Sequence, residues 1–432
     1  MALLAVIRAQ TDRLKGGGLA AESAWGLLLE FVTLVGTVLS FALLGRSLGA
    51  AGYGGYASLY AIVGPLVTLA ASGVVLALLQ HIVRDGEPLA ETARSCLSLS
   101  LALGFPLTLV GAGLATLVVD SLTTVAIVAI LLTEFVAAPV VQVAASTLQA
   151  GTGFIDAAKL RLVLVVGRIA ILATLFAANR LTVATLGLTM LALSLVVGIW
   201  SLRNVGDRYG FRFTPGRVKV RHLKTNALYS TGISAVALNS DGDKLVLAAN
   251  KLVIDTGLYA AAYRIVSFGL VPIGGIVNVS HRRFLQHEEG VKRQHLDRAL
   301  RFGLVSAAYG LIFGIVLFMA APLLPTLLGE EFEGSVTMVR WLSPTVLMRS
   351  AGIFSLNGLM GLGHNALRTG IIVANSACAM ALYVVLIPRY GWEGAAIGTL
   401  ISETIAVSST WGALIICQRR ADRAIDESRA RR

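Results

Sequence analysis

Apolar residues fill long stretches of this chain, and short polar stretches separate them. Runs of ~20 apolar residues match the ~30 Å hydrocarbon core of a bilayer. We find twelve such stretches, at roughly 24–45, 55–80, 95–118, 122–148, 158–178, 182–202, 226–250, 257–280, 299–328, 333–360, 366–388 and 392–417. Lipid offers a backbone no hydrogen-bond partners, so these stretches are predicted to be helices. The chain contains none of the ~10-residue segments of alternating polar and apolar residues that are typical of a membrane β-barrel.

Composition supports this pattern. Of the 432 residues, 56% are hydrophobic and only 14% are charged; the mean hydropathy is +0.77. A soluble globular domain carries roughly 25% charged residues. We therefore predict an all-α polytopic membrane protein with about twelve transmembrane helices.

The position of the basic residues predicts the orientation of these helices. The net charge of +12 could indicate nucleic-acid binding, but Lys and Arg cluster in short stretches between apolar runs. With a cytoplasmic N-terminus, the inward segments carry 27 Lys and Arg and the outward loops carry five. Cytoplasmic loops are enriched in basic residues, so both termini are predicted to be cytoplasmic. No nucleic-acid partner is expected.

An internal repeat indicates two related halves. The pattern Gly54-x-Tyr56-Ala57-x-x-Tyr60 recurs 203 residues later as Gly257-x-Tyr259-Ala260-x-x-Tyr263. The offset spans six helices, so the halves are expected to form a parallel pseudo-twofold repeat about an axis along the membrane normal. We assign six-helix halves to residues 1–202 and 225–418, a basic cytoplasmic linker to 203–224 and a basic cytoplasmic tail to 419–432.

Four groups of short motifs carry a family resemblance. They are Leu48-Gly49-Ala50-Ala51-Gly52-Tyr53-Gly54 with Ala70-Ala71-Ser72-Gly73, Asp243-Lys244-Leu245 with Asp255-Thr256-Gly257, Leu327-Leu328-Gly329-Glu330-Glu331-Phe332, and Tyr390-Gly391-Trp392-Glu393-Gly394. Each motif is weak alone, but together they extend over nearly the whole chain. In this order they resemble the Wzx-type polysaccharide flippases of the multidrug/oligosaccharidyl-lipid/polysaccharide (MOP) exporter superfamily, which also contains the MATE drug exporters.

This resemblance implies a function that composition does not. Such flippases carry polyprenyl-diphosphate-linked oligosaccharides from the inner to the outer leaflet, by alternating access between two halves. The expected location is the cytoplasmic (inner) membrane of a bacterium or archaeon. The expected partners are the polyprenyl-linked glycan, membrane lipids and envelope glycan assembly proteins.

Three other functions stay open. A MATE-type cation-coupled drug exporter would share the superfamily. A membrane-embedded glycan polymerase or transferase is disfavoured by outward loops of only about ten residues. A major-facilitator carrier would also have two six-helix halves, but its basic Gly-Asp motif is missing after the second span.

The sequence lacks the motifs of several chemistries. No phosphate-binding loop or HExxH motif occurs, and neither histidines nor cysteines form a cluster with metal-ligand spacing. The three cysteines lie far apart and are expected to be small buried apolar residues. We predict no enzymatic activity, no cofactor and no metal site.

Charges inside predicted spans are the candidate functional residues. Each costs on the order of 2.5–3.5 kcal/mol on insertion scales, so each is expected to meet a partner or a watery cavity. They are Glu30, Glu134, Arg168, Asp241, Asp243, Lys244, Arg264, Arg349 and Glu403. Structural ion pairs between Glu134 and Arg168, and between Arg349 and Glu403, are one interpretation.

The densest group lies in the seventh span, with Arg264 following in the eighth. A net positive cavity there would suit a diphosphate, whose oxygens Arg can bind bidentately. Alternatively, Lys244 only neutralises Asp241 at i, i+3. We predict substrate binding by Lys244, Arg264, Asn239, Arg168 and Arg349, and ion coupling by Asp241, Asp243 and Glu134.

The orientation can be tested by labelling. Cysteines placed at Gly329 and Gly216 in a cysteine-free background should react with an impermeant reagent from opposite sides of the membrane, because the basic bias places these loops on different sides. Labelling of both positions from outside would contradict the arrangement in two halves.

Overall fold

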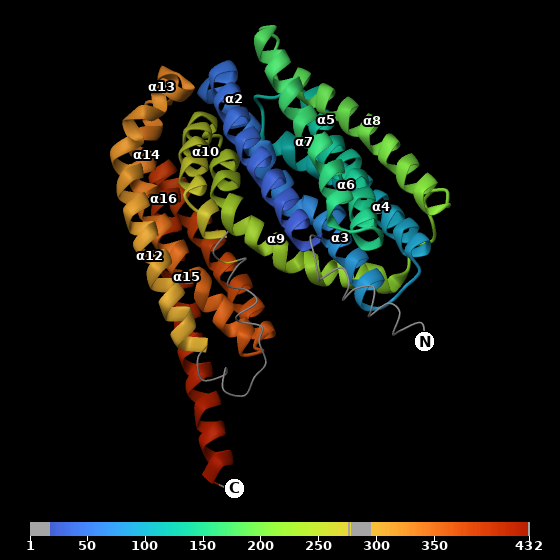
Figure 1. Ribbon diagram of the computed structural model, residues 1–432. Helices are drawn as coiled ribbons and strands as arrows, with labels where there is room; N and C mark the ends of the chain where they lie inside the picture. Colours follow the sequence, from blue (N-terminus) through green and yellow to red (C-terminus); the bar gives the residue numbers. More distant parts are fainter. Residues whose placement is uncertain (1–17, 275–276, 278–294, 431–432) are drawn as a thin grey trace. The chain divides into compact units, whose positions relative to one another are not determined.

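The computed structural model describes residues 18–274, 277 and 295–430, and within these ranges it contains helices and no strand (Figure 1). The first 17 residues and most of the predicted loop around 281–294 lie outside the described residues. The α-helices are α2 (Gly18–Ala70), α3 (Ser72–Leu79), α4 (Leu89–Val118), α5 (Thr124–Leu132), α6 (Ala138–Gly151), α7 (Phe154–Ala177), α8 (Val183–Tyr209), α9 (Val220–Ala249), α10 (Val253–Phe268), α12 (His295–Ala320), α13 (Leu324–Leu328), α14 (Gly334–Leu342), α15 (Pro344–Gly361) and α16 (Asn365–Ala430). The predicted all-α class is confirmed.

Short 3₁₀ and π-helical segments interrupt this series of α-helices. The π-helical turns are η1 (Gln80–Arg84) and η2 (Thr133–Ala137), and the 3₁₀ turns are η4 (Ala321–Leu323) and η5 (Glu330–Phe332). Three of these turns, η1, η2 and η5, contain charged residues. Turns of the π type inside α-helices are frequent at functional sites.

Seven helices among the described residues are long and apolar enough to cross a membrane. Two of them, Ala24–Arg84 and Asn365–Arg423, have 61 and 59 residues. At 1.5 Å per residue each would extend roughly 90 Å, three times the hydrocarbon thickness. Each contains a non-helical glycine, Gly49 with φ 63° or Gly391 with φ 57°, where two helices join. The chain is therefore a multi-pass membrane protein, and twelve spans stay a prediction.

The chain divides into two compact units. Unit 1 contains the described residues of Met1–Leu48, Leu66–Thr116 and Leu122–Ile233, and unit 2 those of Gly49–Pro65, Leu117–Ser121 and Ser234–Arg432. Helix α2 therefore contributes to both units, and so does α9. The chain passes between the units before Gly49, after Pro65, before Leu117, after Ser121 and after Ile233.

A kink at Ala71 separates α2 from α3 inside unit 1, with φ −120° and ψ −81°. A kink frees backbone carbonyls, which in a membrane need new donors. Three side chains supply them: Ser100 Oγ donates to Ala70 O at 2.7 Å, Asn226 Nδ2 to Leu69 O at 3.1 Å, and Ser230 Oγ to Thr68 O at 3.1 Å. A Cβ on Gly73 would lie 2.0 Å from Ser230 Oγ. This glycine of the Ala70–Gly73 motif thus makes room for the α9 donors.

The two copies of the internal repeat pack against each other within unit 2. A Cβ on Gly54 would lie 2.0 Å from the carbonyl oxygen of Val253, and one on Gly257 would lie 2.1 Å from that of Ala50. Both obstacles are backbone atoms, which cannot swing aside. The repeated glycine is therefore required where α2 and α10 come into contact.

A second family motif stabilises the restart of α2 after Gly49. The backbone N–H of Ala50 donates to Glu331 Oε2 at 3.0 Å, as an N-capping carboxylate does. Next to it, Phe332 is fully buried and meets Tyr53 edge to face at 6.1 Å between ring centroids. Motifs 280 residues apart in sequence thus lie together in unit 2.

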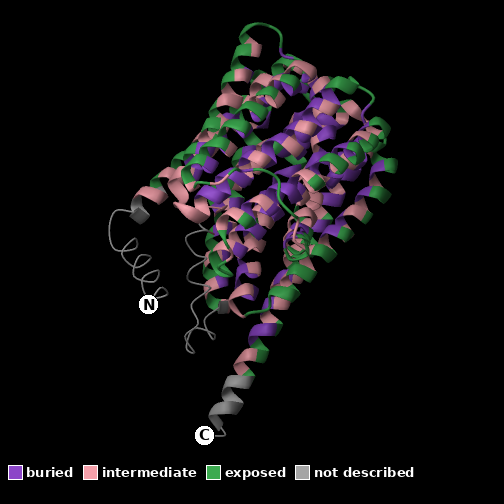
Figure 2. Ribbon diagram, turned by 90° about the vertical axis from the view of Figure 1, so that its right-hand side faces the viewer, coloured by how far each residue is buried: buried purple, intermediate pink, exposed green. Residues whose placement is uncertain are grey.

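The helices show the burial pattern of a membrane protein. Large apolar side chains such as Leu109, Val196 and Met319 are exposed, whereas Ser58, Ser146 and Ser306 are fully buried. Figure 2 shows buried and exposed positions on the same helices. Lipid tails can cover the exposed apolar side chains, and small polar residues permit close helix contacts.

The contact of the two repeats can be tested by adding a single methyl group. Gly54→Ala should destabilise the protein by about 1–3 kcal/mol, because the methyl group would overlap a backbone carbonyl. The matched control is Gly370→Ala in α16, where a Cβ meets nothing within 4 Å. Thermal unfolding in detergent measures both variants. Equal unfolding temperatures for the two would contradict the close contact.

Candidate substrate-binding site

Six of the nine charged residues that we assigned to spans lie in unit 2. Helix α9 carries three of them, and α10, α15 and α16 carry one each. They are Asp241, Asp243, Lys244, Arg264, Arg349 and Glu403. Three are acidic and three are basic, so this group of six residues is charge-balanced.

The ammonium group of Lys244 is buried and fully occupied. It donates to the carbonyl oxygen of Ser240, to Asp241 Oδ1 at 3.1 Å and to Asp243 Oδ1 at 3.2 Å. An ammonium group has three donors, so none is left over. The Lys244 Nζ atom also lies 3.6 Å from the ring centroid of Tyr263. In this arrangement Lys244 is the counter-ion of two aspartates.

The two aspartates differ in their surroundings. The side chain of Asp243 is 1% exposed, whereas that of Asp241 is 34% exposed. Asp243 Oδ1 also accepts from the backbone N–H of Lys244 at 2.8 Å. Its other oxygen, Oδ2, is buried and has no hydrogen-bond partner among the described residues. An unpaired buried carboxylate oxygen is costly, so this atom is suited to accept a proton or a cation.

Tyr263 connects this group to a second ion pair. The guanidinium carbon of Arg349 lies 5.2 Å from the same ring centroid. Arg349 donates through Nε to Glu403 Oε1 at 2.7 Å, and its Nη2 lies 2.7 Å from the same oxygen. The predicted pairing of Arg349 with Glu403 is therefore confirmed. Because guanidinium has five N–H donors, Arg349 keeps donors beyond this pair.

A cavity of about 280 Å³ adjoins this ion pair within unit 2. Its lining combines apolar side chains with a few polar ones, a composition typical of ligand sites. The polar lining residues are Asn239, Ser240, Arg349, Asn375, Ser376, Glu403 and Thr410. Two predicted substrate residues, Asn239 and Arg349, thus line one cavity.

Arg264 lies outside the lining of this cavity and is exposed. Its guanidinium group hydrogen-bonds to the hydroxyl of Tyr53 and faces the charge of Asp241. Lys244 and Arg264 therefore have different environments: one is buried between aspartates, and the other is accessible. Only Arg264 has the accessibility that an anion-binding residue needs.

The remaining predicted pair lies in unit 1. Arg168 Nη2 is 3.6 Å from Glu134 Oε1, and Glu134 lies in the π-helical turn η2. The expected ion pair between these helices is confirmed. Their predicted roles in substrate binding and ion coupling stay predictions.

Two residues of this site, Tyr263 and Asn375, were not among those predicted from the sequence. Tyr263, between Lys244 and Arg349, belongs to the repeat, and its position there was the only signal. Asn375 lines the cavity and donates to Ser409 Oγ at 3.2 Å, but a single asparagine in an apolar run carries no pattern.

Comparison with known proteins places the chain in a family. A family model described as polysaccharide biosynthesis protein matches residues 19–280. The chain belongs to the polysaccharide biosynthesis protein family. This confirms the resemblance inferred from its motifs. No curated protein matches this family member significantly.

Solved structures show the fold of this polysaccharide biosynthesis protein. An inward-facing MATE family multidrug resistance transporter of the MOP superfamily is 13% identical, with a TM-score of 0.70 over 91% of this chain and 95% of that chain. An outward-facing one is 15% identical, with a TM-score of 0.62 over 95% and 98%. A MOP superfamily transporter from Pyrococcus furiosus, described as having a binding pocket of reverse polarity, is 14% identical, with a TM-score of 0.60 over 93% and 95%. The fold is that of the MOP superfamily.

Proposed function

We propose that this protein is a flippase that moves a polyprenyl-diphosphate-linked oligosaccharide across the cytoplasmic membrane. The observation that carries the proposal is the cavity of unit 2, which polar side chains and an ion pair line in part, in a member of the polysaccharide biosynthesis family. Helices that contact only lipid need no such cavity. A polar headgroup that crosses the membrane needs one, because it cannot enter the hydrocarbon core at low cost.

The chemistry of the cavity suits a glycan attached to a phosphate. The amides of Asn239 and Asn375 can donate to and accept from sugar hydroxyls. The donors of Arg349 beyond its pair with Glu403 can bind phosphate oxygens. Arg264 is the second candidate for the diphosphate, whereas Lys244 is proposed to keep the two aspartates neutralised.

Energy coupling is proposed for the aspartates of α9. The sequence contains no phosphate-binding loop, so an ion gradient, the membrane potential or later assembly steps must supply the driving force. The partnerless Oδ2 atom of Asp243 makes this carboxylate the first candidate, with Asp241 and Glu134 as the others. A proton or cation bound there would alter the charge that Lys244 balances.

The proposal also includes location and partners. We place the protein in the cytoplasmic membrane of a bacterium or archaeon with both termini inside, because of the distribution of basic residues. Membrane lipids contact its exposed apolar side chains, and envelope glycan assembly proteins would receive the exported glycan.

A MATE-type drug exporter is the second candidate, because solved transporters of that family share the fold. The two functions differ in the charge of their ligand. The six charged span residues of unit 2 are balanced, which does not favour a cationic ligand. A transporter that shares the fold is described as having a binding pocket of reverse polarity.

Binding to the purified protein separates these functions. A polyprenyl-diphosphate-linked glycan should bind more tightly than the same lipid with a monophosphate. Arg264→Gln should lower its affinity about 10- to 150-fold, because one charge-assisted hydrogen bond is worth roughly 1.5–3 kcal/mol. Arg264→Lys should recover only part, since the planar fork is lost.

The controls use the same substitution elsewhere. Arg389→Gln, at an exposed position of α16, should leave the affinity unchanged. Arg349→Gln is made as a double variant with Glu403→Gln, so that neither member of the ion pair leaves an unpaired buried charge. Tight binding of a cationic drug, together with unchanged glycan affinity in every arginine variant, would support the exporter instead.

A further inference from the structure

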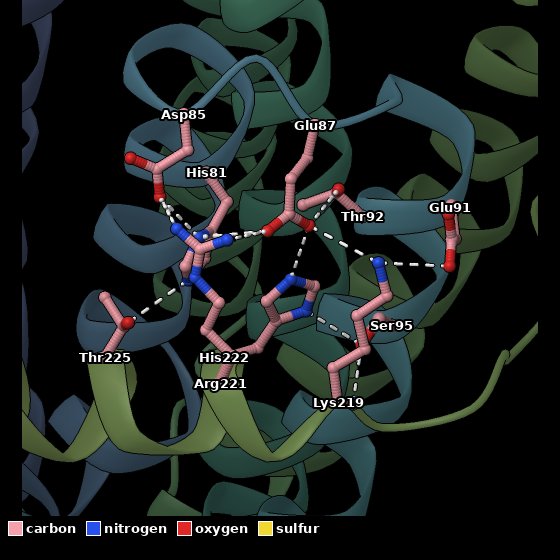
Figure 3. A network of polar contacts seen from close by, with 10 residues as sticks. All are labelled: His81, Asp85, Glu87, Glu91, Thr92, Ser95, Lys219, Arg221, His222 and Thr225. Carbon is pink, nitrogen blue, oxygen red and sulfur yellow. Dashed lines mark hydrogen bonds and ion pairs between the residues drawn. The ribbon is translucent and has the colours of Figure 1, made fainter.

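Two histidines that are 141 residues apart in sequence meet in unit 1. His81 belongs to the π-helical turn η1, and His222 belongs to the first turn of α9. Their ring centroids are 4.5 Å apart, and their side chains are 1% and 0% exposed. Glu87, on the connection between η1 and α4, points at both rings (Figure 3).

The ligand atoms of these three residues are close enough for one metal ion. His222 Nε2 lies 3.0 Å from Glu87 Oε2, and His81 Nδ1 lies 3.4 Å from Glu87 Oε1. One ligand atom from each residue falls within 4.8 Å of the others. Ligands of tetrahedral zinc, at bonds of about 2.0–2.2 Å, are about 3.3 Å apart. Small side-chain movements would therefore complete the geometry.

The outer nitrogen of each imidazole is already held. His222 Nδ1 lies 2.9 Å from Ser95 Oγ, and His81 Nε2 lies 3.1 Å from Thr225 Oγ1. Histidines that bind metals usually have such a partner, which fixes the ring orientation and the tautomer. In each ring the remaining nitrogen faces Glu87.

Acidic side chains outnumber basic ones around the histidines, which favours the binding of a cation. Asp85 Oδ2 accepts a hydrogen bond from, or pairs with, His81 Nδ1 at 2.9 Å. Arg221 pairs with Asp85 and Glu87, and Lys219 pairs with Glu87 and Glu91. Three carboxylates therefore face two basic side chains. Arg221 is 60% exposed and Lys219 is 34% exposed, so both can turn to solvent when a metal takes the carboxylates.

We propose that His81, Glu87 and His222 are three ligands of a zinc site, with a solvent molecule as the fourth. Two imidazoles and a carboxylate oxygen are ligands that zinc accepts in tetrahedral sites. The ion would join the start of α9, within the basic segment 203–224, to the connection between η1 and α4. The site is independent of the proposed transport function, because it uses none of the residues of the unit 2 cavity.

Zinc binding to the full-length protein tests the site. The protein is purified in detergent without a histidine tag, stripped with a chelator and titrated in competition with a chromogenic zinc indicator. We expect one tightly bound equivalent and a higher unfolding temperature with zinc. His222→Ala and His81→Ala should each weaken binding at least 100-fold, and Ser95→Ala about 10- to 100-fold, because it only orients a ligand.

The matched control is His364→Ala, an exposed histidine outside the cluster, which should bind zinc like the wild type. Cobalt absorption in the visible range would report tetrahedral coordination in the wild type. Wild-type protein that binds no zinc, or binds it no better than the His81→Ala/His222→Ala double variant, would overturn the proposal. The cluster would then be a hydrogen-bonded network only. This outcome needs no correctly folded variant, because the wild type decides it.

Discussion

Lipid provides no hydrogen-bond partners, so each backbone break and each charge inside a span must be compensated by the protein itself. The kink at Ala71 shows how this is done, because Ser100 donates to a carbonyl freed there. At the turn between two predicted spans, Glu331 accepts from the amide of Ala50 where α2 restarts. Helices that bend inside a membrane thus depend on a few polar side chains from distant parts of the sequence.

The same constraint shapes the candidate site. Lys244 pairs with Asp241 and Asp243 within one helix, and Arg349 pairs with Glu403 between two helices. Tyr263 contacts both cations through its ring. Because the internal charges largely satisfy one another, the cavity beside them presents amides and the remaining donors of Arg349. Such a surface can bind a polar headgroup. It lacks the strong net charge that would bind a transported group too tightly for release.

Much of this arrangement was predictable from the sequence. The apolar runs predict the helices, the repeated glycines at 54 and 257 predict related segments, and the motifs predict the family. The pairing of Arg349 with Glu403 follows from the cost of buried charge. The contacts of single side chains, in contrast, cannot be predicted from the sequence. Lys244 could equally have faced a substrate, since spacing alone does not show which acceptors its three donors meet.

The histidine cluster shows the limit of sequence analysis most clearly. Metal motifs are recognised by short spacings, and no short spacing connects His81 with His222. Only the folding of α9 against the connection between η1 and α4 brings them together. Likewise, the sequence predicts that glycines permit close contacts, but the carbonyl that faces Gly54 is known only from the packing.

The central claim concerns movement of a lipid-linked glycan between leaflets. The purified protein, reconstituted into liposomes that contain a polyprenyl-diphosphate-linked oligosaccharide, should make the inner-leaflet glycan accessible to an external glycosidase. Protein-free liposomes should keep about half of the glycan protected, since a bilayer has two leaflets. Proteoliposomes that protect the glycan equally well, yet carry a cationic drug down a cation gradient, would contradict the account.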